Sequence, residues 1–258
     1  MKKALIITLA GLMICPCALG RYQQTRSSAT AQEPKAAEQL PSVDQILNRY
    51  VQAIGGKVAI ERLTSLILTG TMEVQAAGIS GKAELIARAP NKYVLKVDIE
   101  GVGTFTQAFD GTAGWAQDPI NGLRDISGVE LAQLKREADL HHQTHMKELY
   151  TKLAVKGKEK VGTSETYVIE ATPPEGGTEK LYFDTQSGLL VRTDAVARSP
   201  QGEIPAEVYI EDYKEVSGVK IAVTVRQVTP VLTSTIKFTN IKPNVEIDQS
   251  RFSKPNSQ

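Results

Sequence analysis

Residues 219–238 read VKIAVTVRQVTPVLTSTIKF, and the pattern of this stretch decides the fold class. Apolar and polar side chains alternate from Val219 to Val225 and again from Leu232 to Phe238. A period of two is typical of a β-strand that buries one face and exposes the other. Because only a short segment separates the two runs, we expect them to form strands that pair antiparallel.

The same alternation recurs in other parts of the chain. It runs through 93–99 and 167–171, where apolar side chains again occupy every second position. Turn-forming dipeptides separate the runs, namely Pro90-Asn91, Asp110-Gly111, Asn121-Gly122, Ser187-Gly188, Gln201-Gly202 and Ser217-Gly218. Together the runs and the turns predict about ten antiparallel strands that follow one another along the chain.

A helix precedes the first strand. Ser42 and Gln45 form a capping box, in which each side chain satisfies a free backbone amide at the start of a helix. One apolar stripe follows, made of Val43, Ile46, Leu47, Tyr50, Val51 and Ile54. Gly55 and Gly56 should end this helix, since glycine adopts the left-handed conformation easily. A short second helix is expected over residues 57–63.

A further helix interrupts the strands. Ser127 and Glu130 form a second capping box, and an apolar face follows it, made of Leu131, Leu134, Ala138, Met146 and Leu149. The order is therefore helices, about five strands, a helix and about five more strands. This order predicts a mainly antiparallel α+β fold, in which one large sheet curls and its helices cover the concave face. We assign residues 42–258 to this single domain.

The N-terminus has the layout of a secretory signal peptide. Lys2 and Lys3 precede about 16 mostly apolar residues, and small residues then stand before a cleavage point after Gly20. A second cleavage point after Ala31 remains an alternative. Residues 21–41 are polar, without an apolar period, and are expected to form a flexible leader. We therefore expect an exported, periplasmic protein with residues 1–20 removed.

Both cysteines lie inside this signal segment. Lipid anchoring needs a small residue before the modified cysteine, and Ile14 precedes Cys15 while Pro16 precedes Cys17. Cleavage is therefore favoured over a lipid anchor, and the mature chain would contain no cysteine. Removal of the two lysines would also change the net charge from +1 to −1. Such a neutral chain has no concentrated basic face, so nucleic acid is not expected as a partner.

The candidate chemistry in the sequence is limited. His141, His142 and His145 are the only histidines, and His141 and His145 have the spacing of a zinc-binding pair on a helix. The alternative is that these side chains pack on the helix without metal. Neither a Gly-x-Ser-x-Gly nucleophile motif nor a phosphate-binding glycine loop is present. We therefore predict no cofactor and no catalytic residue.

Five segments follow one another in a characteristic order and spacing. They are Tyr50-x-x-Ala53-Ile54-Gly55-Gly56, Phe109-Asp110-Gly111-x-x-x-Trp115 with Pro119 after it, Tyr182-Phe183-Asp184 to Gly188-Leu189-Leu190, Asp212-Tyr213 to Gly218-Val219-Lys220, and Asn244-x-x-Ile247-Asp248 to Phe252-x-x-Pro255. Together they resemble the LolA-like superfamily of outer-membrane lipoprotein-sorting proteins, in particular an uncharacterised exported branch. The resemblance covers residues 42–255. Ala222 departs from it, because this branch has proline at that position.

The resemblance implies a monomeric half-barrel that holds acyl chains between its sheet and helices, without an enzymatic step. The ligand would be a lipoprotein acyl chain, a lipid or another hydrophobic molecule. The candidate cavity wall is Leu47, Val51, Tyr93, Leu95, Val97, Ile99, Phe105, Trp115, Leu131, Leu134, Ile236 and Phe238. The same residues would equally fill a solid core. An alternative function is an envelope module of the same fold that binds a protein partner or acts as a sensor.

Overall fold

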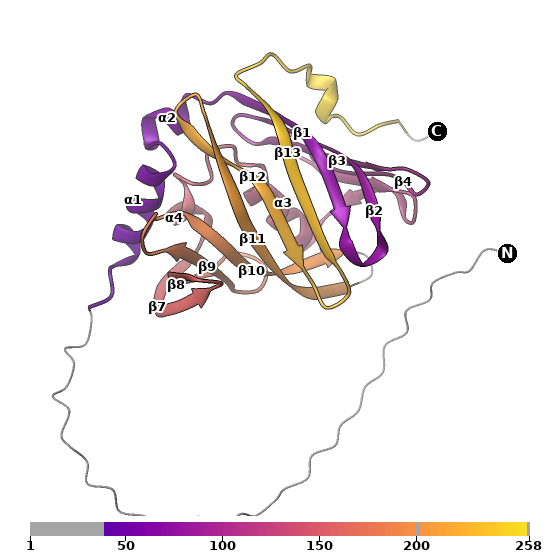
Figure 1. The fold of residues 1–258 in the computed structure, drawn as a ribbon. Coiled ribbons are helices and arrows are strands. Elements are labelled where there is room, and N and C mark those ends of the chain that lie inside the picture. The colour runs from indigo at the N-terminus through magenta and orange to yellow at the C-terminus, as the bar shows by residue number, and fades with distance from the viewer. Residues whose placement is uncertain (1–38, 200–201, 257–258) are drawn as a thin grey trace, which may run out of the picture. The chain divides into compact units, whose positions relative to one another are not determined.

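A computed structural model describes residues 39–199 and 202–256. Within them, 13 strands form one open antiparallel sheet (Figure 1). The predicted signal peptide, its cysteines and residues 21–38 of the leader lie outside the described residues. The mainly antiparallel fold class is confirmed, and the expected number of about ten strands is too low.

The strands form two groups along the chain. The first group is β1 (Ser65–Val74), β2 (Ile79–Arg88), β3 (Lys92–Ile99), β4 (Gly103–Phe109), β5 (Gly114–Asp118) and β6 (Gly122–Ile126). The second group is β7 (Lys152–Val161), β8 (Ser164–Thr172), β9 (Glu179–Asp184), β10 (Leu190–Ser199), β11 (Gly202–Val216), β12 (Val219–Val228) and β13 (Thr233–Pro243). The opening stretch of the sequence therefore forms β12 and β13, as predicted.

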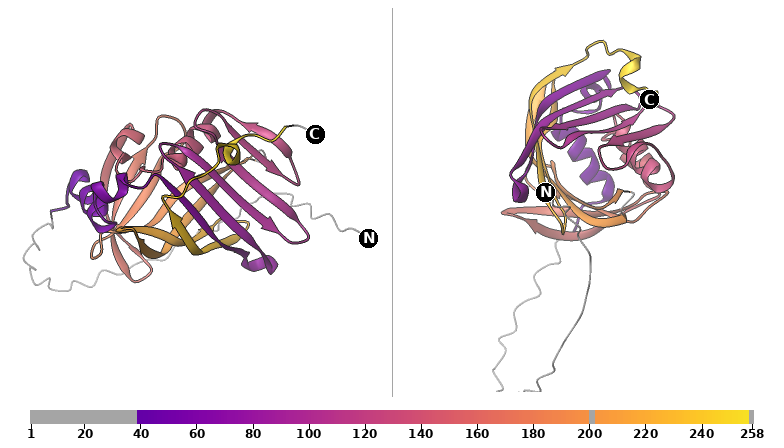
Figure 2. Two further views of the ribbon diagram at one scale, coloured as in Figure 1. Left: turned by 90° about the horizontal axis from the view of Figure 1, so that it is seen from above. Right: turned by 90° about the vertical axis from the view of Figure 1, so that its right-hand side faces the viewer.

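The order of strands in the sheet is β6-β5-β4-β3-β2-β1-β13-β12-β11-β10-β9-β8-β7. Within each group, every strand pairs with its neighbours in sequence, and the ladder between β1 and β13 joins the two groups at the centre. The chain thus runs from the centre to the β6 edge, crosses to the β7 edge and returns. The crossing segment, residues 127–151, contains helices α3 (Gly128–Ala138) and α4 (Met146–Leu149). Figure 2 shows the curled sheet wrapping around its helices.

Helix α1 (Val43–Ala53) begins with the predicted capping box. The Ser42 hydroxyl accepts a hydrogen bond from the Gln45 amide at 3.2 Å, and the Gln45 side chain accepts one from the Ser42 amide at 2.8 Å. The helix buries Ile46, Leu47 and Tyr50, and the Tyr50 ring meets the Phe183 ring edge-on at 5.3 Å. After Gly55 and Gly56 a short helix α2 (Lys57–Glu61) follows, which ends slightly before the predicted residue 63.

The second predicted helix differs from expectation in its start and its length. The Ser127 side chain does not cap α3, because Glu130 instead forms two hydrogen bonds with the Arg124 guanidinium, at 2.6 and 2.8 Å. Such a two-point charged pair is stronger than a neutral cap. The helix then ends at Ala138 rather than continuing to Leu149. The Asp139 carboxylate accepts a hydrogen bond from the His141 amide at 2.9 Å, a local bond that competes with helical bonding.

The C-terminal segment covers the outer face of the first group of strands. The 3₁₀ turn η2 (Gln249–Phe252) places Phe252 in an apolar cluster with Ile86, Val94, Ala108, Trp115 and Ile247. The Trp115 indole N–H donates to the Phe252 carbonyl at 3.0 Å. Neighbouring residues of a strand point to opposite faces, and Ala116 packs with Leu134 of α3. Trp115 therefore lies on the face turned away from α3.

A close approach of two backbones at the centre of the sheet requires glycine at position 70. A Cβ atom there would lie 1.9 Å from the Lys237 carbonyl oxygen and 2.7 Å from the Phe238 Cα. We therefore expect Gly70→Ala to lower the free energy of unfolding by about 1–3 kcal/mol or more, measured by urea denaturation. Gly177→Ala is the matched control, because its Cβ would meet nothing closer than 3.8 Å. Equal stability of the two variants would contradict this account of the β1–β13 ladder.

Candidate functional site

A cavity of 260 Å³ lies between α3 and the concave face of the sheet. Its wall combines β3, β4, α3, β10, β11 and β12, in the residues Tyr93, Leu95, Gln107, Glu130, Gln133, Leu134, Glu137, Ala195, Val196, Ala197, Arg198, Ala206, Val208 and Gln227. An engineered apolar cavity of about 150 Å³ binds benzene, and ligand pockets usually span about 300–1,000 Å³. The volume is therefore sufficient for a small ligand or for part of a longer chain.

Other hollows of the described residues have different surroundings. Two of 440 and 410 Å³ lie over β1–β3 and are lined by sheet residues alone, including the charged side chains Lys82 and Asp98. No helix contributes to their walls, so they are open concavities of the sheet surface. A third, of 70 Å³, lies between α1 and strands β8 and β9. Of these four hollows, the cavity under α3 is the one that has both a covering helix and enough volume for a ligand.

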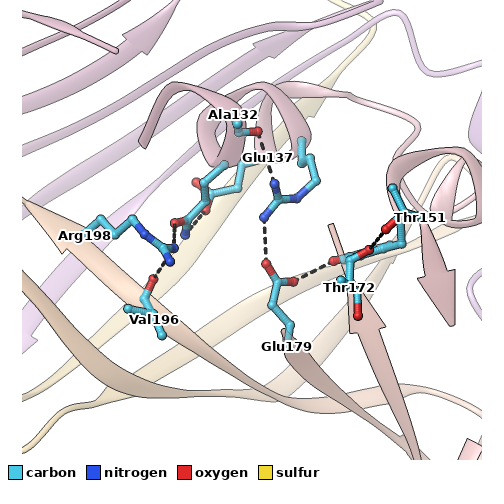
Figure 3. Close-up of polar contacts among 10 residues, drawn as sticks. Ala132, Glu137, Thr151, Thr172, Glu179, Val196 and Arg198 are labelled. Atoms are coloured by element: carbon cyan, nitrogen blue, oxygen red, sulfur yellow. Dashed lines mark hydrogen bonds and ion pairs between the residues drawn. The ribbon is translucent and has the colours of Figure 1, made fainter. Parts of the chain in front are cut away.

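One side of the cavity under α3 is polar (Figure 3). The Arg198 guanidinium contacts the Gln133 side-chain oxygen at 3.4 Å, and the Gln133 amide nitrogen donates to the Glu137 carboxylate at 3.0 Å. Arg198 also binds the Glu203 carboxylate at 2.9 Å and the Val196 carbonyl at 3.3 Å. Gln133 therefore links a paired arginine of β10 to a carboxylate of α3.

Glu137 has an unusual environment. Its side chain lines the cavity and remains accessible there, while the surrounding protein partly desolvates the carboxyl. This desolvation raises the pKa of the carboxyl above its usual value. The hydrogen bond from Gln133 and the charge of Arg136 act in the opposite direction, whereas Glu179 raises the pKa further. Burial and the nearby Glu137 carboxylate also raise the pKa of the Tyr93 hydroxyl.

A second set of polar contacts ties α3 to the sheet. The Arg136 guanidinium binds the Glu179 carboxylate of β9 at 2.7 Å, and both side chains are only 12% exposed. The Tyr150 hydroxyl donates to the other Glu179 oxygen at 2.7 Å, and burial and this carboxylate raise the pKa of Tyr150. Figure 3 shows Glu179 below the helix, where it receives both contacts. These contacts hold the C-terminal half of α3 against the second group of strands.

The predicted wall residues occupy different places. Tyr93, Leu95 and Leu134 line the cavity. The main core cluster contains Leu47, Val51, Val97, Ile99, Phe105, Ile236 and Phe238, so the structure gathers these on the concave side next to α1. Leu131, a residue of α3, packs with Phe109 and Ile126 of the first group of strands. Trp115 stands apart from all of them, on the outer face against the C-terminal segment.

The three histidines lie in the turns between α3 and α4 rather than on a helix. A ring nitrogen of His141 contacts the Leu63 carbonyl at 2.8 Å, one of His145 contacts the Asp139 carboxylate at 2.7 Å, and one of His142 contacts the Asp139 carbonyl at 3.1 Å. Burial lowers the pKa of His142. Over residues 39–199 and 202–256, no three His, Cys, Asp or Glu side chains are grouped to hold a metal ion.

The polar residues of the cavity were not among the predicted site residues. The helical period contained a signal for three of them, since Glu130, Gln133 and Glu137 share one face of α3 with Leu134. If the Leu134 side chain faces the sheet, the other side chains on the same face of the helix must face it too. For Arg198 and Gln227, which come from β10 and β12, the sequence offers no such signal.

The comparisons show a shared fold. Neither a protein-family model nor a curated protein matches the sequence. A DUF1329 family protein from Desulfovibrio piger matches with 13% identity and a TM-score of 0.57, covering 82% of this chain and 97% of the other. A LolA superfamily protein from Nitrosomonas europaea matches with 10% identity and a TM-score of 0.56, covering 83% of this chain and 99% of the other.

A third solved structure shares the same fold. A domain named as an outer membrane lipoprotein-sorting protein from Vibrio parahaemolyticus has 11% identity and a TM-score of 0.54. The match covers 83% of this chain and 98% of that domain. The chain therefore has the LolA-like fold, as the sequence resemblance predicted. None of the helices in the described part of the chain is long and apolar enough to cross a membrane.

Proposed function

We propose that this protein is an exported, periplasmic carrier or binding protein for a lipid-like ligand, and that it has no enzymatic step. The ligand is a lipoprotein acyl chain, a lipid or another hydrophobic molecule, held between α3 and the concave face of the sheet. The cavity of 260 Å³ is the observation that carries this proposal. The LolA-like fold supports it, because a lipoprotein-sorting domain is among the proteins that share this fold.

The concave face provides further support. Leu95, Phe105 and Ile236 point to the inside of the curled sheet, yet they are only partly buried. Apolar side chains that face inward without full cover leave surface on which an alkyl chain can pack. A group of water size takes about 30 Å³, so the cavity holds about eight or nine such groups. One short alkyl chain fits, and a longer chain requires α3 to move.

The binding energy expected from this volume is modest. Burial of about eight methylene groups contributes at most about 6 kcal/mol, at about 0.8 kcal/mol each. Ordering the ligand reduces this, so an octyl chain should bind no more tightly than the micromolar range. Tighter binding of longer chains would show that the interior expands around them.

We expect Val208→Trp to weaken binding of octanol at least tenfold, because the larger ring occupies the space beside the α3 helix. Val208 lines the cavity and is partly buried. Binding is measured by isothermal titration calorimetry on protein purified without detergent. Val231→Trp is the matched control, because Val231 is 57% exposed and lies away from the cavity. Circular dichroism and thermal melting of both variants establish that they remain folded.

Two results would contradict the proposal. One is a wild-type protein that contains no lipid after solvent extraction and binds neither octanol nor a fluorescent fatty acid. The other is equal binding by both tryptophan variants, which would place the ligand elsewhere. The first result would leave the alternative function, an envelope module that binds a protein partner or acts as a sensor.

A further inference from the structure

The charged side chains of the cavity wall differ in whether they have a partner of opposite charge. Glu130 pairs with Arg124 at 2.6 Å, and Arg198 pairs with Glu203 at 2.9 Å. Glu137 accepts a hydrogen bond from Gln133 at 3.0 Å, and over residues 39–199 and 202–256 no basic side chain forms an ion pair with it. The cavity therefore contains one carboxylate that is held in place but not neutralised.

This carboxylate shares the cavity with apolar side chains. Leu95, Leu134 and Val208 line the same space, from β3, α3 and β11. The cavity thus offers an apolar wall for an alkyl chain and one acceptor for a polar end group. An anionic end group would meet Glu137 with like charge, and Arg198 is already bound to Glu203 and the Val196 carbonyl.

We propose that the ligand is an alkyl chain ending in a protonated amine, and that Glu137 forms the ion pair that holds this amine. The proposal rests on the function proposed above and specifies the chemistry of its ligand. The amine replaces solvent at the carboxylate, and its three N–H donors match an acceptor whose one hydrogen-bond partner among the described residues is Gln133. A hydrogen bond to a charged group is stronger than one between neutral groups.

The groups around Glu137 are compatible with this pairing. Arg136, the next residue along α3, is bound to Glu179 of β9 at 2.7 Å. These two opposite charges act on Glu137 in opposite directions. Tyr93 approaches from β3, and its raised pKa keeps it neutral at physiological pH. Gln133 and Arg198 complete the polar side of the cavity.

The proposal predicts a pH dependence with a definite sign. The amine of an alkyl chain, like that of lysine, has a pKa near 10.4 and stays protonated between pH 5 and pH 8. The Glu137 carboxyl has its pKa raised above 4.5 by desolvation, so its ionised fraction grows as the pH rises above that value. Affinity for the amine should therefore increase from pH 5 to pH 8, and affinity for an alcohol should not.

The test compares three octyl ligands, namely octylamine, octanol and octanoate, by isothermal titration calorimetry at pH 8 and pH 5. We expect the wild-type protein to bind octylamine about tenfold more tightly than octanol at pH 8, and octanoate least tightly. Glu137→Gln should abolish the preference for octylamine and retain octanol binding. Glu148→Gln is the control, because Glu148 lies exposed on α4 outside the cavity.

Each outcome decides one question. An unchanged preference for octylamine in Glu137→Gln would overturn the role of Glu137, and a preference for octanoate would overturn the amine. If the variant fails to fold, the pH series on the wild-type protein, extended to pH 4, still decides, since the carboxyl is mostly protonated there and a preference that persists unchanged contradicts the ion pair. Failure of all three ligands to bind the wild-type protein would instead refute the proposed function itself.

Discussion

Phe252→Ala should lower the free energy of unfolding by about 3–5 kcal/mol, although Phe252 lies only six residues from the C-terminus. Its side chain is 0% exposed and packs among Ile86, Val94 and Ala108 on the outer face of the sheet. Truncation to alanine removes the ring and leaves a cavity that the surrounding strands cannot fill. Urea denaturation measures the loss, with the fluorescence of Trp115, the single tryptophan, as the signal.

The neighbouring residue provides the control. Arg251 pairs with Glu84 at 2.7 Å, but its side chain is 46% exposed. Solvent screens such a pair, so Arg251→Ala should change the stability by less than about 1 kcal/mol. Trp115 emission should also shift to longer wavelength in Phe252→Ala, because loss of the ring opens the apolar cluster around the indole to solvent. If the two variants are equally stable, the C-terminal segment is not part of the core.

Arg136→Met should lower the free energy of unfolding by about 3 kcal/mol, because it leaves the Glu179 carboxylate without its cation. Both side chains are 12% exposed, so solvent replaces the lost pair poorly. The Tyr150 hydroxyl still donates to Glu179, which limits the loss. Urea denaturation gives the stability, and native-state hydrogen exchange shows where it is lost. Amides of α3 should exchange faster, and those of the central strands should change little.

Two further variants distinguish this ion pair from a general loss of charge. Lys147→Met removes the pair with Asp44, whose side chains are 61% and 62% exposed, and should leave the stability nearly unchanged. Arg136→Met combined with Glu179→Gln should lose less stability than the sum of the single changes, by about 1–3 kcal/mol. Strictly additive losses would mean that the two residues act independently.

The two capping boxes show how far local sequence patterns predict this fold. Ser42 and Gln45 form theirs, because neither side chain has a stronger partner nearby. Ser127 and Glu130 have an equivalent spacing, but Arg124 of β6 takes the glutamate. The difference depends on a residue that the fold brings close. The pattern at 127–130 therefore predicted the position of a helix correctly and its capping contacts incorrectly.

The strands were predictable where they are long. Alternation from Val219 to Val225 and from Leu232 to Phe238 is unambiguous, whereas β5 and β6 have only 5 residues each, too few to show a period. Trp115 shows a different limit. Strand geometry places the Trp115 side chain on one face of β5 and its neighbours on the other. The C-terminal segment, however, gives this part of the sheet an apolar outer layer as well. When both faces are apolar, alternation does not identify the inner one.

The cavity could be predicted only in outline. The curled sheet and its covering helix follow from the order of elements, and these imply an interior. Whether that interior is filled depends on side-chain sizes at facing positions. Leu47, Val97 and Phe238 belong to a packed cluster near α1, whereas small residues such as Ala195 and Ala206 leave space opposite α3. Such pairings across distant strands are not visible in a single sequence.

The central place of β13 has a consequence for biosynthesis. Residues 233–243 are made after all the other strands, yet they pair with β1 and β12 in the middle of the sheet. A nascent chain that lacks them has two separate meanders, each with one unpaired inner strand. Unpaired strands of this kind promote aggregation. The native sheet therefore cannot be completed until the residues up to Pro243 have left the ribosome.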